Sequence, residues 1–170
     1  TDDVLIKIEN EDMQIVTDEV DETDMVKAVA YFSQGLCLGY IGLLYDQAFI
    51  VTHETNLEEG VEVSPYADVI EAAVSSLEMA ATISNDAEAF TIPSTWIPLT
   101  TAMTSDNFAK LANSFAARIL AYSPRNKTQN DNLDWQRVYD FASEGIDFDF
   151  APIMDDITWY SLYSIYANYS

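Results

Sequence analysis

The sequence has little cysteine, histidine or basic charge, and each scarcity excludes a class of protein. One cysteine, Cys37, permits no internal disulfide, and one histidine with one cysteine cannot make a structural zinc site. Seven Lys and Arg stand against 29 Asp and Glu, which gives a formal net charge of −22. Phosphate backbones bind proteins through Lys and Arg. We therefore expect no nucleic-acid partner.

Catalytic and metal-binding motifs are also missing. A hydrolytic triad needs a nucleophile and an oriented imidazole, but the single histidine, His53, falls in a predicted loop. Cys37 lies between Leu36 and Leu38, and this apolar setting predicts a buried, inert thiol. The run 130–134 has alternating oxygen ligands but lacks the glycine and glutamate of a calcium-binding EF-hand. We predict a protein that is not an enzyme and has no cofactor and no metal site.

The longest uncharged run, residues 28–45, is close to the length of a membrane span. It contains Ser33, Gln34 and three glycines, which favour a helix packed in protein over one in lipid. We expect Gly35 and Gly39 to let another helix approach closely, and the helix to be covered on both sides beyond Gly35, because it is apolar nearly all round there. The apolar residues that recur at helical spacing are Met25, Val29, Phe32, Leu36, Tyr40 and Leu43.

Capping residues and helical periodicity predict further helices, and no segment alternates with period two over a useful length. The short apolar segment 47–52 is suited to an extended conformation, whereas 125–131 is predicted to be a polar loop. The predicted helices are 23–46 with Thr23 as N-cap, 64–84 with Ser64 as N-cap and Pro65 at the first position, 104–123, 132–144 with Asp131 or Asn132 as N-cap and Gly145 as the stop, and a tyrosine-rich helix after Asp155 or Asp156.

Two of these helices have apolar faces that we assign to the core. In the third helix, Leu111 and Phe115 belong to a regular apolar stripe. The expected core face of the fourth helix comprises Trp135, Val138, Tyr139 and Ala142.

The order of the helices predicts an all-α fold of stacked antiparallel hairpins. Helices 23–46 and 64–84 form one hairpin, and residues 104–145 form a second, with a length near that of a tetratricopeptide unit. Such hairpins stack into a right-handed superhelix. We divide the chain into an acidic N-terminal segment, 1–22, and a helical-repeat domain, 23–170.

Three aromatic residues are candidates for ligand binding. Trp96 lies between Pro93 and Pro98 in the irregular segment 90–103, where a rigid loop can present an indole ring to a sugar. The alternative is that Trp96 fastens its loop to the helices. Trp159 and Tyr160 form a second candidate pair.

An ordered set of short segments resembles the SusD/RagB family of nutrient-binding proteins. The strongest segment is AKLANSFAARILAY, residues 109–122. The others, in chain order, are Tyr45–Asp46–Gln47–Ala48, Ser64–Pro65–Tyr66, Val69–Ile70, Ile92–Pro93, Trp96, Pro124–Arg125–Asn126, Asp134–Trp135, Val138, Ala142 and Gly145–Ile146. The resemblance covers most of residues 23–160.

The resemblance implies a role that the composition does not. Members of this family are outer-membrane lipoproteins with tetratricopeptide-like helices, and they bind glycans, or sometimes peptides, for import through a TonB-dependent transporter. They are much longer than 170 residues. We therefore expect a fragment of a lipid-anchored surface protein whose partners are an oligosaccharide or other nutrient and a SusC-like transporter. The alternative is a helical-repeat scaffold that binds a protein partner and has no glycan site of its own.

Overall fold

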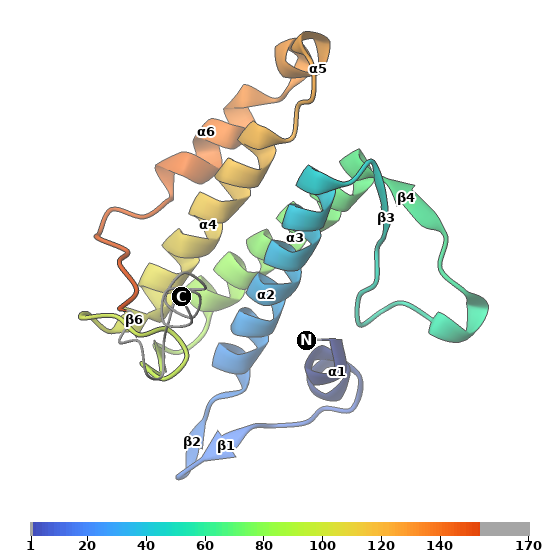
Figure 1. The fold of residues 1–170 in the computed structure, drawn as a ribbon. Helices are drawn as coiled ribbons and strands as arrows, with labels where there is room; N and C mark the ends of the chain where they lie inside the picture. Colours follow the sequence, from blue (N-terminus) through green and yellow to red (C-terminus); the bar gives the residue numbers. More distant parts are fainter. Residues whose placement is uncertain (1, 154–170) are drawn as a thin grey trace, which may run out of the picture.

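The computed structural model describes residues 2–153 and is mostly helical within that range, as the sequence predicted (Figure 1). The helix predicted after Asp155 lies outside the described residues. The helices are α1 (Asp2–Leu5), which continues into a π-helical turn η1 (Ile6–Asn10), α2 (Thr23–Leu44), the 3₁₀ turn η2 (Leu57–Glu59), α3 (Tyr66–Asp86), α4 (Ser105–Tyr122), α5 (Lys127–Asn132) and α6 (Trp135–Ser143).

Three two-stranded antiparallel ribbons precede the long helices and were not predicted from the sequence. Each ribbon ends at or just before a helix start, so that it sets the direction in which the chain enters α2, α3 or α4. The ribbons are β1 (Val16–Thr17) with β2 (Val20–Asp21), β3 (Gln47–Phe49) with β4 (Val63–Pro65), and β5 (Thr91–Ile92) with β6 (Met103–Thr104). Strand β3 lies in the segment that was expected to be extended.

Side-chain acceptors lie at the starts of α2 and α4, whereas α3 has no side-chain cap. The prediction that Thr23 is the N-cap of α2 is wrong, because Thr23 is already the first residue of the helix. The Asp21 carboxylate accepts a hydrogen bond from the Thr23 N–H, and the Thr104 hydroxyl accepts one from the Asn107 N–H. These acceptors satisfy N–H groups that have no partner within the helix. The second helix begins at Tyr66 rather than at Pro65, because Ser64 and Pro65 belong to strand β4.

The helices run alternately up and down (Figure 1). Helix α3 packs against both α2 and α4, and α4 packs in turn against α6. The chain therefore forms two consecutive antiparallel hairpins, α2–α3 and α4–α6. No helix within residues 2–153 has both the length and the apolar composition needed to cross a membrane.

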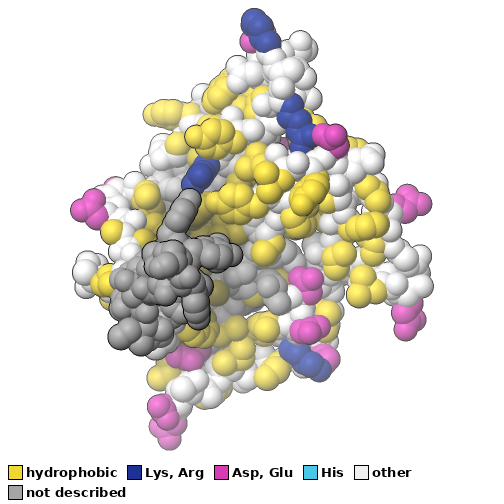
Figure 2. All heavy atoms as spheres, in the orientation of Figure 1, with side chains coloured by type: hydrophobic (Ala, Val, Ile, Leu, Met, Phe, Trp, Pro, Cys, Tyr) yellow, Lys and Arg dark blue, Asp and Glu magenta, His cyan; other side chains and the backbone are white. Residues whose placement is uncertain are grey.

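The prediction that α2 is covered on both sides is wrong. Its C-terminal half exposes a row of residues that we call the α2 stripe: Cys37, Tyr40, Ile41 and Leu44. The predicted burial of Cys37 is therefore also wrong. Burial falls instead on Leu38, Gly39 and Gly42, which face α3 and α4. Figure 2 shows hydrophobic side chains gathered over the middle of the face formed by α2 and α4.

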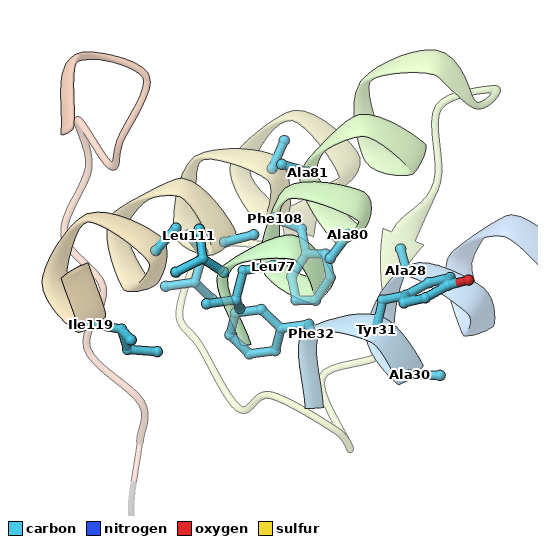
Figure 3. Close-up of a cluster of buried hydrophobic side chains, with 14 of the residues drawn as sticks. Ala28, Ala30, Tyr31, Phe32, Leu77, Ala80, Ala81, Phe108, Leu111 and Ile119 are labelled. Atoms are coloured by element: carbon cyan, nitrogen blue, oxygen red, sulfur yellow. The ribbon is translucent and has the colours of Figure 1, made fainter. Parts of the chain in front are cut away.

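The core lies where α2, α3 and α4 meet (Figure 3). Phe32 of α2 packs on Phe108 of α4 with 4.9 Å between ring centres, and Leu77 of α3 is fully buried beside them. Leu111 is buried as predicted, with 2% of its surface exposed. Phe115 is only partly buried, at the rim of this core, where its ring meets the edge of Phe32.

Glycines allow α2 to approach both neighbouring helices, as the sequence predicted. A Cβ atom added to Gly35 would lie 2.7 Å from Leu77 Cγ of α3. A Cβ added to Gly39 would lie 2.3 Å from Ile119 Cδ1 of α4. Contacts this short do not occur between real side chains, so a side chain at Gly35 or Gly39 would force its neighbour to move.

The region after α4 departs from the prediction. Residues 125–131 were expected to form a loop, but Lys127–Asn132 is the short helix α5, capped by the Asn126 side chain. Helix α6 then begins only at Trp135, with the Asp134 carboxylate accepting from the Arg137 N–H. The predicted core face of this helix is mostly wrong, because only Val138 of that set packs against the core, together with Phe141. The other members of the predicted face are exposed: Trp135, Tyr139 and Ala142.

The acidic N-terminal segment packs on α2. Leu5 is fully buried in the main core, and Ile8 is 8% exposed. The Gln34 side chain of α2 donates a hydrogen bond of 2.9 Å to the Asp2 carboxylate. Leu5 and Ile8 of this segment thus point inward, while most of its acidic residues and the hydrophobic side chains of Val4, Met13, Val16 and Val20 lie on the surface.

Candidate functional site

Three helix ends meet at Arg125, just after α4. Its guanidinium donates to the Gly42 carbonyl oxygen at 3.0 Å, to the Tyr45 carbonyl oxygen at 2.6 Å and to the Asp46 carboxylate. Its Cζ atom also lies 3.8 Å from the centre of the Tyr66 ring, where a guanidinium is attracted by the aromatic face. Arg125 therefore ties the end of α2 and the start of α3 to the end of α4. We call this set of contacts the Arg125 junction.

The junction unites segments that are far apart in the sequence. Three of the segments that carry the family resemblance meet here: Tyr45–Asp46, Ser64–Pro65–Tyr66 and Pro124–Arg125–Asn126. Arg125 contacts Tyr45 across 80 positions of the chain and Tyr66 across about 60. A cavity of about 400 Å³ opens beside the junction. Its lining includes Tyr66, Ile70, Leu120, Pro124, Leu133 and Arg137.

A second cavity, of about 370 Å³, lies between α3 and α6 and shares Arg137 with the first. The Arg137 guanidinium bridges the two helices through a 2.7 Å ion pair with Glu71 of α3. Its guanidinium carbon lies 5.8 Å from the centre of the Phe141 ring. This arginine was not singled out from the sequence, because nothing local shows that α3 and α6 lie beside it.

A third, smaller cavity of about 250 Å³ lies under the loop between β3 and β4. His53, from that loop, makes an edge contact with Tyr31 and so packs against α2. Its Nδ1 atom is buried and has no hydrogen-bond partner within the part of the chain that the structure describes. Ser76 donates to the Gln34 side chain on the same wall. Burial, together with the nearby Glu9 carboxylate, raises the pKa of the Tyr31 hydroxyl to about 12.

An ion pair holds the N-terminal segment beside this cavity. Lys27 of α2 lies 2.7 Å from the Glu9 carboxylate, which also accepts a hydrogen bond from the Tyr31 hydroxyl. The hydrogen bond from Lys27 lowers the pKa of Glu9, although partial burial acts in the opposite direction. Glu9 therefore carries its charge in the folded protein at neutral pH.

Trp96 lies in the loop that connects β5 and β6, away from the Arg125 junction (Figure 1). The backbone N–H groups of Trp96 and Ile97 both donate to the Pro93 carbonyl oxygen, which closes a tight turn. The Trp96 side chain is 45% exposed, which agrees with the predicted partial exposure. Trp159 and Tyr160 lie outside the described residues.

Within residues 2–153, the structure contains no group of three or more His, Cys, Asp or Glu side chains that could hold a metal ion. The chain matches no protein-family model, and no curated protein or solved structure resembles it at a significant level.

Proposed function

We propose that this chain is the helical-repeat part of a SusD-like nutrient-binding protein. In this proposal the full-length protein is lipid-anchored at the outer-membrane surface and passes an oligosaccharide or other nutrient to a TonB-dependent, SusC-like transporter. The chain itself is non-catalytic. Its two hairpins belong to a right-handed, tetratricopeptide-like superhelix.

The observation that carries this proposal is the Arg125 junction. The family resemblance was assembled from short segments, each of which is weak alone. In the fold, three of these segments make direct contact through one guanidinium. Segments that jointly build one structural feature are a coherent set, whereas chance matches have no reason to meet. The alternation of helices in two consecutive hairpins supports the same proposal.

The proposed ligand is a neutral or cationic oligomer that stacks on Trp96. A sugar ring packs its C–H groups against an aromatic face and needs few charged partners. A polyanionic glycan would require arginine or lysine clamps. The chain has three arginines, and two of them, Arg125 and Arg137, already pair with Asp46 and Glu71.

Screening the purified chain against an array of neutral and anionic oligosaccharides tests the proposal. We expect retention on neutral glycans and none on sulfated or uronate polymers. Preferential binding to the anionic polymers would contradict the charge argument. Binding to no glycan would favour the second candidate function.

The second candidate is a scaffold that binds a protein partner, and the α2 stripe is the observation that favours it. Leu44 is 75% exposed and Ile41 is 36% exposed, and they lie on one face of α2 with Tyr40 and Cys37. Exposed apolar rows of this kind commonly mark protein interaction sites.

A pull-down from an outer-membrane extract tests whether the α2 stripe binds a protein partner. The captured proteins are identified by mass spectrometry. Leu44→Ser should abolish capture of a TonB-dependent transporter or another partner. Leu57→Ser is the control, because Leu57 is 66% exposed but lies in η2, outside the stripe. Equal capture by the wild type and both variants would exclude the α2 stripe as the interface.

A further inference from the structure

Helices α3 and α6 form the two walls of a groove whose floor is α4. The two larger cavities lie along it on either side of Arg137, whose ion pair with Glu71 joins the two walls. Residues of α3 line the groove from Tyr66 to Asn85. At about 1.5 Å per residue, this wall is roughly 28 Å long. We call this feature the α3–α6 groove.

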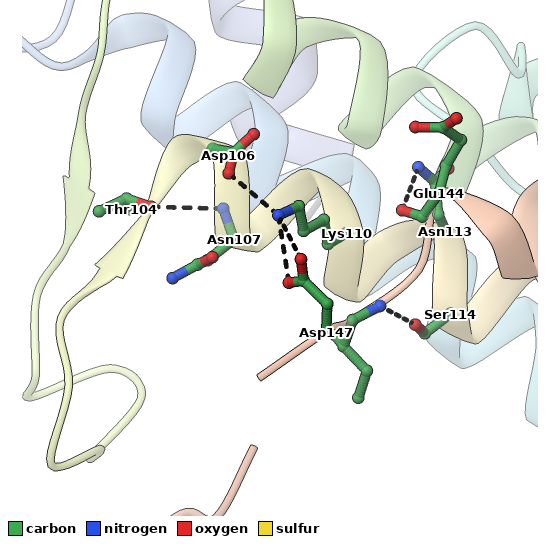
Figure 4. A network of polar contacts seen from close by, with 9 residues as sticks. Thr104, Asp106, Asn107, Lys110, Asn113, Ser114, Glu144 and Asp147 are labelled. Carbon is green, nitrogen blue, oxygen red and sulfur yellow. Dashed lines mark hydrogen bonds and ion pairs between the residues drawn. The ribbon is translucent and has the colours of Figure 1, made fainter. Parts of the chain in front are cut away.

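The α6 wall is fixed to α4 at its C-terminal end (Figure 4). The Asn113 side chain donates to the Glu144 carbonyl oxygen at 3.2 Å, and the Ser114 hydroxyl accepts from the Ile146 N–H at 2.8 Å. Lys110 pairs with Asp147 at 3.1 Å. These contacts hold α6 beside α4 although none of its residues is fully buried. The groove is therefore a built feature of the fold.

The groove is lined by both apolar and acidic side chains. Leu120, Ala81 and Phe141 contribute apolar surface. Arg137 is the one basic side chain that lines it, and its guanidinium is already paired with Glu71. The acidic side chains of the lining are Glu71, Glu78, Asp134, Asp140 and Glu144.

Two of these carboxylates have no partner among the residues that the structure describes. Asp134 caps α6, and Asp140 accepts a hydrogen bond from Gln136. The carboxylates of Glu78 and Glu144 accept no hydrogen bond and form no ion pair with any residue between 2 and 153. Both line the cavity of about 370 Å³. An uncompensated negative pair in a concave site attracts positive charge.

We propose that the α3–α6 groove binds a basic peptide segment in an extended conformation. Its Lys or Arg side chains pair with Glu78 and Glu144, and its apolar atoms lie on Phe141 and Ala81. Eight extended residues span about 27 Å, which matches the length of the α3 wall. A folded basic domain would not enter a groove between two helices. This interaction goes beyond nutrient binding, because it uses neither Trp96 nor the α2 stripe.

Fluorescence anisotropy with a labelled eight-residue peptide of alternating lysine and glycine tests this proposal at physiological salt. We expect saturable binding, and no binding of the matching glutamate–glycine or serine–glycine peptides. Glu78→Gln with Glu144→Gln should weaken binding about tenfold, because two charge pairs are lost. Thr82→Arg, an exposed change in the groove wall, should weaken it by placing positive charge in the site.

A matched control distinguishes binding in the groove from general attraction to the overall charge of −22. Glu62→Gln with Glu88→Gln removes two exposed carboxylates that line none of the three cavities, and it should change the affinity less than twofold. Equal weakening by the two double variants would overturn the proposal, because it would show attraction to the whole surface. Absence of binding by the lysine peptide, or equal binding of the serine peptide, would also overturn it.

Discussion

At the residue scale, Arg125 holds three helix ends through contacts that no other side chain in the described region duplicates. We predict that Arg125→Ala lowers the free energy of unfolding by about 2 kcal/mol, because a partly buried guanidinium loses hydrogen bonds to two backbone carbonyls and one carboxylate. Urea denaturation followed by circular dichroism measures this loss.

Two further variants test the origin of that loss. Arg125→Lys should recover less than half of it, since an ammonium group cannot donate in the planar fork or stack on Tyr66 in the same way. Arg118→Ala, at an exposed position of α4, should change the stability by less than about 0.5 kcal/mol. Equal effects of Arg118→Ala and Arg125→Ala would show that the junction contributes nothing specific.

The ion pair between Glu9 and Lys27 should make the free energy of unfolding depend on pH, with less stabilisation in acid. The pKa of Glu9 is lowered in the folded protein, chiefly by the hydrogen bond from Lys27. The stabilisation from a group with a lowered pKa is present above its pKa in the unfolded chain, and it is lost as the pH falls through the pKa of the folded state. We therefore predict that Lys27→Met costs about 0.5–1 kcal/mol at neutral pH and progressively less in acid.

Urea denaturation of the wild type and Lys27→Met, from neutral pH downward, measures this difference. Lys7→Met is the control, because Lys7 and Glu11 form an i,i+4 pair with about half of each side chain exposed. It should cost only a few tenths of a kcal/mol at neutral pH. A Lys27→Met penalty that stays constant or grows in acid would contradict the assigned role of Glu9.

At the scale of the element, the closeness of α2 to α4 depends on Gly39. Gly39→Ala should destabilise the protein by about 1–3 kcal/mol, despite the better helix propensity of alanine, because its Cβ would overlap Ile119 Cδ1. Ile119→Val removes that atom and should cost about 0.5–1.5 kcal/mol alone. The double variant should cost less than the sum of the single variants. Strict additivity in a double-mutant cycle would show that the two residues are not in contact.

The start of α4 was predictable because it has a local signal, the capping Thr104. Helix α4 begins directly after Thr104 and ends before Ser123–Pro124, as expected from its cap and its regular apolar stripe. Helix α5 was missed because six residues, Lys127–Asn132, contain no apolar face that periodicity could detect. The face of α6 was mostly mispredicted because Trp135 is apolar but its indole N–H donates to the Asn130 carbonyl oxygen, so the ring turns toward α5.

The buried face of α2 also could not be predicted from its sequence. Beyond Gly35 the helix is apolar nearly all round, so its sequence gives no direction for the buried face. The glycines were the informative residues, because Gly39 and Gly42 mark where Ile119 and Ile70 approach. Tyr40 and Cys37 consequently lie on the opposite, exposed side.

At the scale of the whole molecule, the exposure of Trp96 was predictable and the cavities were not. Two prolines that flank an indole within six residues exclude a regular helix and favour an exposed turn. The Arg125 junction and the α3–α6 groove depend instead on helices separated by tens of residues. Nothing in the local sequence of Arg125 or Arg137 shows which carboxylate each will meet.

The most direct test of nutrient binding is to titrate the chain with a neutral oligosaccharide and record its tryptophan fluorescence. Trp135→Ala is a matched control for Trp96→Ala, because the two side chains are 46% and 45% exposed. We predict a saturable fluorescence change that persists in Trp135→Ala and vanishes in Trp96→Ala. A response that survives in Trp96→Ala, or one produced only by a sulfated or uronate polymer, would contradict the account.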